Sequence, residues 1–192
     1  MANAGAKLAL CLYSGARRCG CCAASVLYVD ASALVKRYVE EEADGGGAMM
    51  DAVVSSAARW GGIASSEWLI LEVTSALTRK LRGLKITREA FDRYLRRFRE
   101  DTRGLLLIPV QSQGITEASR LMESLQTLER FHSGDAIHLQ TALQLRDDIA
   151  GTEPLVFVTT DPGLKMVAAR HDIPVFDPRS DTLEYLESLT GR

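Results

Sequence analysis

Four acidic residues stand where a predicted strand ends, where a helix begins, or on an apolar helix face: Asp30, Glu72, Asp135 and Asp161. Four carboxylates that converge cannot all stay ionised unless a cation neutralises them. Hard oxygen ligands with room for water suit Mg²⁺ or Mn²⁺. One or two such ions can activate water for in-line attack on a phosphodiester, so these residue types predict metal-dependent chemistry on a phosphate ester.

Asp30 directly follows a run of four β-prone residues, 26–29, and an apolar helical pattern begins after it. In an open parallel sheet, ligands and chemistry collect at the strand ends where helices begin, which makes Asp30 a site candidate. Asp30 and Ser32 are also good helix N-cap residues, so a purely structural role stays open.

Glu72 lies within the predicted helix 66–81, for which Ser65 or Ser66 is the expected N-cap. Its neighbours one turn away are Trp68, Leu69 and Ala76. This pattern places the carboxylate on or close to the buried face, where an unpaired charge is costly. A salt bridge to an arginine would compensate the charge, and so would a metal or a catalytic role.

Asp135 falls in the first turn of the helix predicted over 133–143, with Ser133 or Gly134 as its cap. The helix dipole favours an acid there, so a structural role again stays open. We expect His138, one turn later, to be a satisfied helix histidine, with a supporting role beside the acids as the alternative.

Asp161 repeats the pattern of Asp30, since it follows the β-rich run 155–159 and precedes Pro162. Proline is favoured at the first position of a helix, which makes Asp161 an expected N-cap as well as a site candidate.

Strands and helices alternate along the chain, which predicts an α/β fold of three layers, α/β/α, around a mostly parallel central sheet. Asp30 and Asp161 would then lie at the same edge of that sheet. The proline at position 109 predicts an edge position, or a strand end, for the run 105–110. The expected strands are 26–29, 105–110, 155–159 and 173–177, with 61–65 as a short strand or an entry turn. The expected helices are 48–59, 66–81, 85–103, 116–128, 133–143 and 181–189.

The formal charge of −2 gives no overall indication of nucleic-acid binding, but the charge is unevenly distributed. Residues 79–103 contain ten Lys or Arg and four Asp or Glu, a local charge of +6, which leaves −8 for the rest. A basic surface beside an acidic one suits a polyanion held near a metal site, although a solvated, salt-bridged helix face is the alternative. The candidates for phosphate contacts are Arg93, Arg96, Arg97 and Arg99.

Four segments around the acids resemble the four acidic motifs of PIN-domain ribonucleases, specifically the VapC-type toxins of VapBC toxin–antitoxin pairs. These segments are 26–35, 65–77, 134–143 and 158–161. Their order, spacing and flanking residues match over roughly residues 26 to 178. Each motif alone is weak, whereas the ordered set is specific.

The resemblance implies a PIN-like fold and a metal-dependent endoribonuclease, with Mg²⁺ or Mn²⁺ as cofactor. It also implies a homodimer that is inhibited by a small antitoxin, which inserts a basic or aromatic side chain into the acidic pocket. Ser32 and Thr159 match positions that assist by hydrogen bonding. The residues that match the catalytic, metal-binding acids of the family are Asp30, Glu72, Asp135 and Asp161.

The chain of 192 residues, 46% hydrophobic, is long enough for one well-buried core. We expect a disordered extension over 1–25, a PIN-like nuclease domain over 26–180, and a helical tail over 181–192. The extension holds all four cysteines, without zinc-site spacing, and the cysteine-free remainder fits a reducing cytoplasm. No run reaches the roughly 18 apolar residues of a membrane span, so no membrane association is expected.

Two other functions remain open. A strand followed by Asp30-Ala-Ser32 superficially resembles the nucleophile motif of aspartyl-phosphate phosphatases, but that chemistry wants a second acid where Ser32 stands. A catalytically silent module that binds RNA or protein on the same fold is the other possibility, because fold does not establish function.

Overall fold

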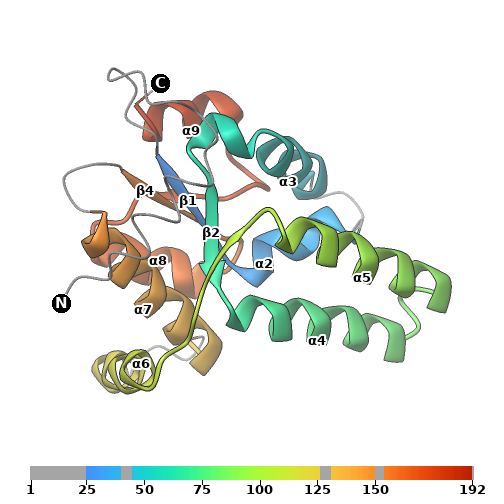
Figure 1. The fold of residues 1–192 in the computed structure, drawn as a ribbon, viewed down its shortest axis with the longest axis horizontal. Helices are drawn as coiled ribbons and strands as arrows, with labels where there is room; N and C mark the ends of the chain where they lie inside the picture. The colour runs from blue at the N-terminus through green and yellow to red at the C-terminus, as the bar shows by residue number, and fades with distance from the viewer. Residues whose placement is uncertain (1–24, 40–44, 126–130, 150–153, 192) are drawn as a thin grey trace.

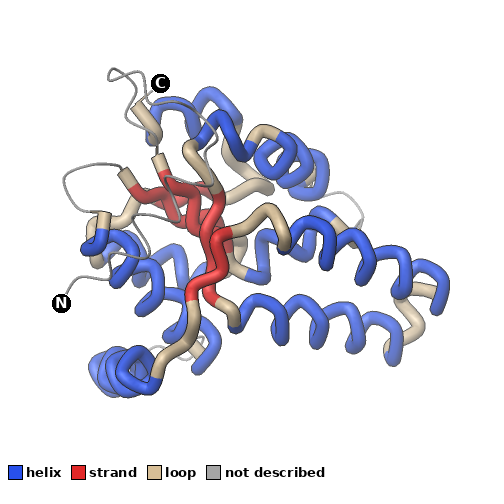
Figure 2. Tube along the Cα trace, viewed as in Figure 1, coloured by secondary structure: helices blue, strands red, loops and turns tan. Residues whose placement is uncertain are grey.

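The computed structural model describes residues 25–39, 45–125, 131–149 and 154–191. Its centre is a five-stranded sheet in the order β3-β2-β1-β4-β5, in which every neighbouring pair is parallel. Figure 2 shows the strands as one twisted layer with helices on both sides. The strands are β1 Val26–Val29, β2 Ile63–Ser66, β3 Leu106–Ile108, β4 Leu155–Val158 and β5 Val175–Phe176.

The central strand β1 shows how the sequence builds two cores. All four of its residues are fully buried, as expected for a parallel strand covered on both faces. Because successive side chains alternate between faces, Leu27 and Val29 pack in one cluster while Val26 and Tyr28 pack in the other. Strand β4 alternates in the same way, so the sheet separates two apolar layers and the fold has the predicted three-layer α/β/α architecture.

The helices on the first face belong to the cluster that contains Leu27 and Val29. They contribute fully buried residues such as Leu69, Val73 and Leu77 from α4. Figure 1 shows α4 and α5 lying side by side and extending away from the sheet. The helices of this face are α2 Ala31–Leu34, α3 Gly46–Ser55, α4 Trp68–Arg82, α5 Arg88–Thr102 and α9 Leu183–Leu189.

The helices on the second face pack against Val26 and Tyr28. Helix α7 is the main one, because Ala136, Leu139 and Ala142 on its inner side are completely buried. Burial of each large apolar side chain stabilises the fold by about 1.5–3 kcal/mol. The helices of this face are α6 Ser112–Ser124, α7 Ser133–Asp148 and α8 Pro162–Arg170.

Several predicted boundaries differ from the structure. The helix expected over 48–59 ends at Ser55, and a short 3₁₀ helix, η2 Ala57–Trp60, follows it. Ser66 is the last residue of β2 rather than an N-cap, although its hydroxyl still accepts the N–H of Trp68. Strand β3 ends at Ile108, directly before Pro109, and lies at the edge of the sheet, as the proline predicted.

The folded region extends beyond both ends of the predicted domain, 26–180. Residues 1–24 of the expected extension lie outside the described residues, but Ser25 is buried and donates a hydrogen bond to the carbonyl of Thr190. Helix α9 forms in the predicted tail and buries Leu186 in the first core. The tail therefore packs on the domain instead of standing apart from it.

Within the described ranges, no helix combines the length and the apolar character needed to span a membrane.

Candidate functional site

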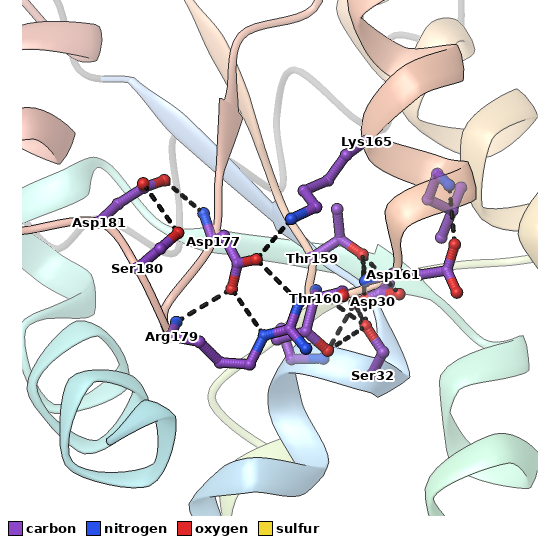
Figure 3. Close-up of polar contacts among 12 residues, drawn as sticks. Asp30, Ser32, Thr159, Thr160, Asp161, Lys165, Asp177, Arg179, Ser180 and Asp181 are labelled. Atoms are coloured by element: carbon purple, nitrogen blue, oxygen red, sulfur yellow. Dashed lines mark hydrogen bonds and ion pairs between the residues drawn. The ribbon is translucent and has the colours of Figure 1, made fainter. Parts of the chain in front are cut away.

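Two of the four predicted acids stand at the ends of adjacent parallel strands. Asp30 follows β1, and Asp161 follows β4 after the turn formed by Thr159 and Thr160. Figure 3 shows the side chains of Asp30, Ser32, Thr159 and Asp161 gathered at this edge. The sequence-based prediction that Asp30 and Asp161 share one edge of the sheet is confirmed.

Asp30 is held by hydrogen bonds on both carboxylate oxygens. Oδ1 accepts from the hydroxyl of Ser32 at 3.0 Å and from the backbone N–H of Ala33 at 3.1 Å, and Oδ2 accepts from Thr159 Oγ1 at 3.1 Å. The residue is 3% exposed. The N-cap role is therefore real, and Ser32 and Thr159 hydrogen-bond the acid as the resemblance implied.

Burial raises the pKa of Asp30 to about 6, because a desolvated carboxylate resists ionisation. The hydrogen bonds from Ala33, Ser32 and Thr159 oppose this shift without cancelling it. No Lys or Arg among the described residues pairs with Asp30. No lysine or arginine of the described residues therefore neutralises the Asp30 carboxylate.

Thr159 joins the two strand-end acids. Its hydroxyl donates to Asp30 and accepts the backbone N–H of Asp161 at 3.0 Å. Asp161 caps α8, since Oδ1 accepts the N–H of Leu164 at 2.8 Å and Pro162 occupies the start of the helix. Its other oxygen, Oδ2, accepts no hydrogen bond from the described residues.

Asp135 lies in the first turn of α7, but the cap of this helix is His132 and not Ser133 or Gly134 as predicted. The His132 N–H donates to Asp135 Oδ2 at 2.7 Å, which fixes one oxygen and leaves Oδ1 without a donor from the described residues. Burial raises the pKa of Asp135 against this hydrogen bond, and the charges of Asp161 and Glu72 raise it further. The three acids are therefore close enough to repel one another.

Glu72 is half-buried, with 28% of its side chain exposed, and its partner is a histidine and not the arginine that was one alternative. Its Oε2 lies 2.7 Å from Nε2 of His138, a buried residue of α7. A side chain at Gly134 would collide with Oε1, so this oxygen lies directly against the backbone of α7 just before Asp135. His138 is thus a satisfied helix histidine, as predicted, and because one of its partners is an acid the supporting role that was the alternative stays open.

The four carboxylates are here called the acid cluster, and three of them share one pattern of hydrogen bonding. Glu72, Asp135 and Asp161 each use one oxygen for a contact with the protein and leave the other without a donor from the described residues. Carboxylate oxygens with spare lone pairs suit Mg²⁺ or Mn²⁺, which complete their coordination with water.

No three His, Cys, Asp or Glu side chains in the described ranges are already spaced to hold a metal ion together. The residues still fit such an ion in two respects, their oxygen donors and their uncompensated charge. A bound cation would remove the repulsion that raises the pKa of Asp135.

A second polar group at the same edge was not predicted from the sequence. Asp177, directly after β5, accepts from Lys165 at 2.6 Å and from the Arg179 guanidinium at 2.9 and 3.1 Å. Arg179 also donates to the carbonyl of Thr160, beside the acid cluster (Figure 3). Asp177 ends a strand as Asp30 and Asp161 do, and this pattern could have identified it.

The basic helix α5 divides into paired and unpaired arginines. Arg97 donates to Asp51 at 2.6 Å, in a network that also holds Arg37 and Asp101. The prediction that Arg97 is a candidate for phosphate contact is therefore not supported, because an acid of the protein already pairs with it. The exposed Arg96 and Arg99 pair with no acid in the described part of the chain. They remain candidates for contact with a polyanion.

No family model matches the chain, and no curated protein matches it. Among solved structures, the chain is similar to the crystal structure of PAE2754 from Pyrobaculum aerophilum, with a TM-score of 0.57 and 20% sequence identity. The match covers 88% of this chain and 92% of that chain. A likeness at this identity establishes the shared fold along most of the chain, and function has to be argued from the site.

Proposed function

We propose that the protein is a metal-dependent endoribonuclease that hydrolyses phosphodiester bonds in RNA, and that it acts as the toxin of a VapC-type toxin–antitoxin pair. One observation carries the proposal. Glu72, Asp135 and Asp161 each keep one carboxylate oxygen without a donor from the described residues, while burial and, after it, the charges of Asp161 and Glu72 raise the pKa of Asp135. Such a site favours a divalent cation and, beside it, a phosphate.

Mg²⁺ or Mn²⁺ would be held by oxygens of the acid cluster, with the hydrogen bonds from Ser32 and Thr159 keeping Asp30 in place. When bound, the ion would supply Lewis-acid polarisation of the scissile phosphate. Asp135 is the acid best placed to take a proton from the attacking water, because its side chain is one-fifth exposed and its Oδ1 has no donor among the described residues.

The exposed arginines of α5 support RNA as the substrate. Arg96 and Arg99 carry charges that no acid in the described residues neutralises, and phosphate contacts of this kind position a nucleic acid without selecting its sequence. Arg93 stacks over the ring of Tyr94 with its guanidinium carbon 5.1 Å from the ring centroid, which leaves a flat cationic surface on the same helix.

The resemblance to VapC-type toxins extends the proposal to a homodimer, a cognate antitoxin and a cytoplasmic location. Two features of the site region support the partners. A basic side chain from an antitoxin would supply the cation that the acid cluster lacks within the described residues. Ile70 and Leu71, which precede Glu72 on α4, are 45% and 57% exposed, an apolar pair suited to contact with another protein.

The structure does not support the phosphatase alternative. Ser32, at the position where aspartyl-phosphate chemistry needs its second acid, donates instead to Asp30. Asp30 itself is 3% exposed and accepts hydrogen bonds on both oxygens, which is unfavourable for attack on a phosphate. A silent RNA-binding module differs from the proposed nuclease only in the outcome of a cleavage assay.

That assay uses purified full-length protein, freed of any co-expressed partner, with a mixed RNA pool in Mg²⁺, in Mn²⁺ and in EDTA. We expect cleavage only with metal, and none by the Asp161→Asn variant. Cleavage that persists in EDTA, or that is equal in the variant, would refute the proposal. RNA binding without any cleavage would favour the silent module.

A further inference from the structure

His138 forms a buried bridge between the central strand and the acid cluster. Its ring is about 1% exposed, and both ring nitrogens have partners. Nδ1 lies 3.1 Å from the hydroxyl of Tyr28 on β1, and Nε2 lies 2.7 Å from Oε2 of Glu72 on α4. Three elements that are far apart in the sequence therefore meet through one imidazole.

The chemistry of the partners fixes where the ring carries its proton. An ionised carboxylate can only accept, so Nε2 must donate to Glu72. In the neutral ring Nδ1 is then the acceptor, and the Tyr28 hydroxyl donates to it. Burial raises the pKa of Tyr28 well above its ordinary value, which keeps this hydroxyl protonated and able to donate.

The position of Tyr28 is set by the core. Its ring is fully buried on β1, meets the His138 ring edge-on at a centroid distance of 5.9 Å, and packs against Phe157 of the neighbouring strand at 5.1 Å. Asp30 follows two residues later on the same strand. The strand that supplies one acid thus also holds the residue that orients another.

The opposite side of the Glu72 carboxylate is confined by the backbone. Gly134 has no side chain, and a Cβ there would collide with Oε1 of Glu72. The carboxylate is therefore held between His138 on Oε2 and Gly134 against Oε1, both on α7. This leaves the lone pairs of Oε1 as the part of Glu72 that is free of protein donors among the described residues.

We propose that His138 is a positioning residue that acts through Glu72. As the Nε2–H tautomer, which the Glu72 carboxylate requires and the Tyr28 hydroxyl matches, it holds Oε2 and so directs Oε1 toward the other carboxylates of the acid cluster. The inference rests on the proposed function for its consequence, which is tighter binding of the divalent cation. The arrangement itself is independent of any activity.

The tautomer is tested by long-range ¹H–¹⁵N correlation spectra of the full-length protein labelled at its histidines, of which there are three. The His138 resonances are those absent from the His138→Gln variant. We expect a fixed neutral ring protonated on Nε2 in the wild type, and exchange between tautomers in Glu72→Gln, whose amide can either donate or accept. A ring protonated on Nδ1, or freely exchanging in the wild type, would overturn the inference.

The consequence is tested by Mn²⁺ affinity, measured from the paramagnetic resonance of the free ion without RNA. His138→Leu should weaken binding by about 10- to 100-fold. His138→Gln should restore most of it, because its amide can donate to Glu72 and accept from Tyr28. His171→Leu, at the far end of α8 from Asp161, serves as the matched control.

The outcomes separate the two proposals. Equal Mn²⁺ affinity in His138→Leu and the wild type, in protein that thermal melting shows to be folded, would overturn the positioning role and leave the nuclease proposal standing. If His138→Leu does not fold, Tyr28→Phe with its smaller expected loss takes its place. A wild type that binds no Mn²⁺ would refute the proposed function. The tautomer measurement alone would then decide whether His138 positions Glu72.

Discussion

Asp30 and Asp177 are almost equally buried, with 3% and 4% of each residue exposed, but their carboxyl groups have opposite electrostatic environments. Burial raises the pKa of Asp30 to about 6, and hydrogen bonds alone do not reverse the shift. Burial also acts to raise the pKa of Asp177, but hydrogen bonds and charges from Arg179 and Lys165 outweigh it and hold the pKa at about 2. Both acids end a strand of the same sheet.

The difference separates an acid whose charge the fold neutralises from the acids for which we propose a bound cation. Asp177 has two cationic partners of its own, so its charge is satisfied inside the protein. Asp30, Asp135 and Asp161 have none among the described Lys and Arg residues. A carboxylate without a cation at a strand end is thus a better indicator of a site than a carboxylate at a strand end alone.

The largest expected effect is that of Asp30→Asn. We expect cleavage to fall on the order of 10³-fold, because the change removes one ligand charge from the acid cluster. We also expect the free energy of unfolding at neutral pH to rise by about 1 kcal/mol, since a buried charge without a cation is removed. Cleavage rates and denaturant unfolding measure the two effects, and a clear loss of stability would contradict the contrast with Asp177.

Gly134→Ala should be the next most damaging change. The added Cβ would collide with Oε1 of Glu72 and displace the carboxylate, which we expect to lower cleavage about 10- to 100-fold. Gly114→Ala in α6 is the matched control, because a Cβ there meets no atom within 4 Å. The control should keep full activity; equal activity of the two variants would show that the position of Glu72 is unimportant.

Asp177→Asn should affect stability rather than metal binding. Loss of the carboxylate removes its ion pairs with Lys165 and Arg179 and should cost about 2 kcal/mol at neutral pH. Because the pKa of Asp177 is lowered in the folded state, the wild type has this stabilisation above about pH 4 and loses it as the pH falls to about 2. The free energies of unfolding of the wild type and of Asp177→Asn, measured with urea, should converge as the pH falls through this range. A difference that stays constant with pH would contradict the account.

Arg96→Glu should have the smallest effect of the four. Reversing one exposed charge on α5 should weaken RNA binding in EDTA by roughly threefold to tenfold and make its salt dependence shallower. Arg120→Glu, on the exposed surface of α6, carries the same charge change on the other face of the sheet. Equal losses in both variants would point to net charge, and would remove α5 from the proposed RNA surface.

The fold was predictable because its determinants are local. Runs of β-prone residues, followed by Asp30 and by Asp161 with Pro162, mark strand–helix junctions that alternation along the chain then assembles into a parallel sheet. The hydrogen bonds from Ser32 and Thr159 lie within the same junctions. The predicted edge shared by Asp30 and Asp161 followed from this pattern alone.

The contacts that the sequence could not predict are those between elements. His138 reaches Glu72 across 66 residues of sequence and Tyr28 across 110, and only the packing of α7 on β1 and α4 brings them together. Arg97 looked available for phosphate, but Asp51, 46 residues away, neutralises it. No period or spacing in the sequence encodes which acid meets which cation.

The most direct test of the contrast is the Mn²⁺ dissociation constant by titration calorimetry for the wild type, Asp135→Asn and Asp177→Asn. If the acid cluster awaits a cation and Asp177 does not, the wild type and Asp177→Asn should bind Mn²⁺ with the same affinity, while Asp135→Asn should lose binding. Absence of binding by the wild type, or equal binding by all three proteins, would contradict the account.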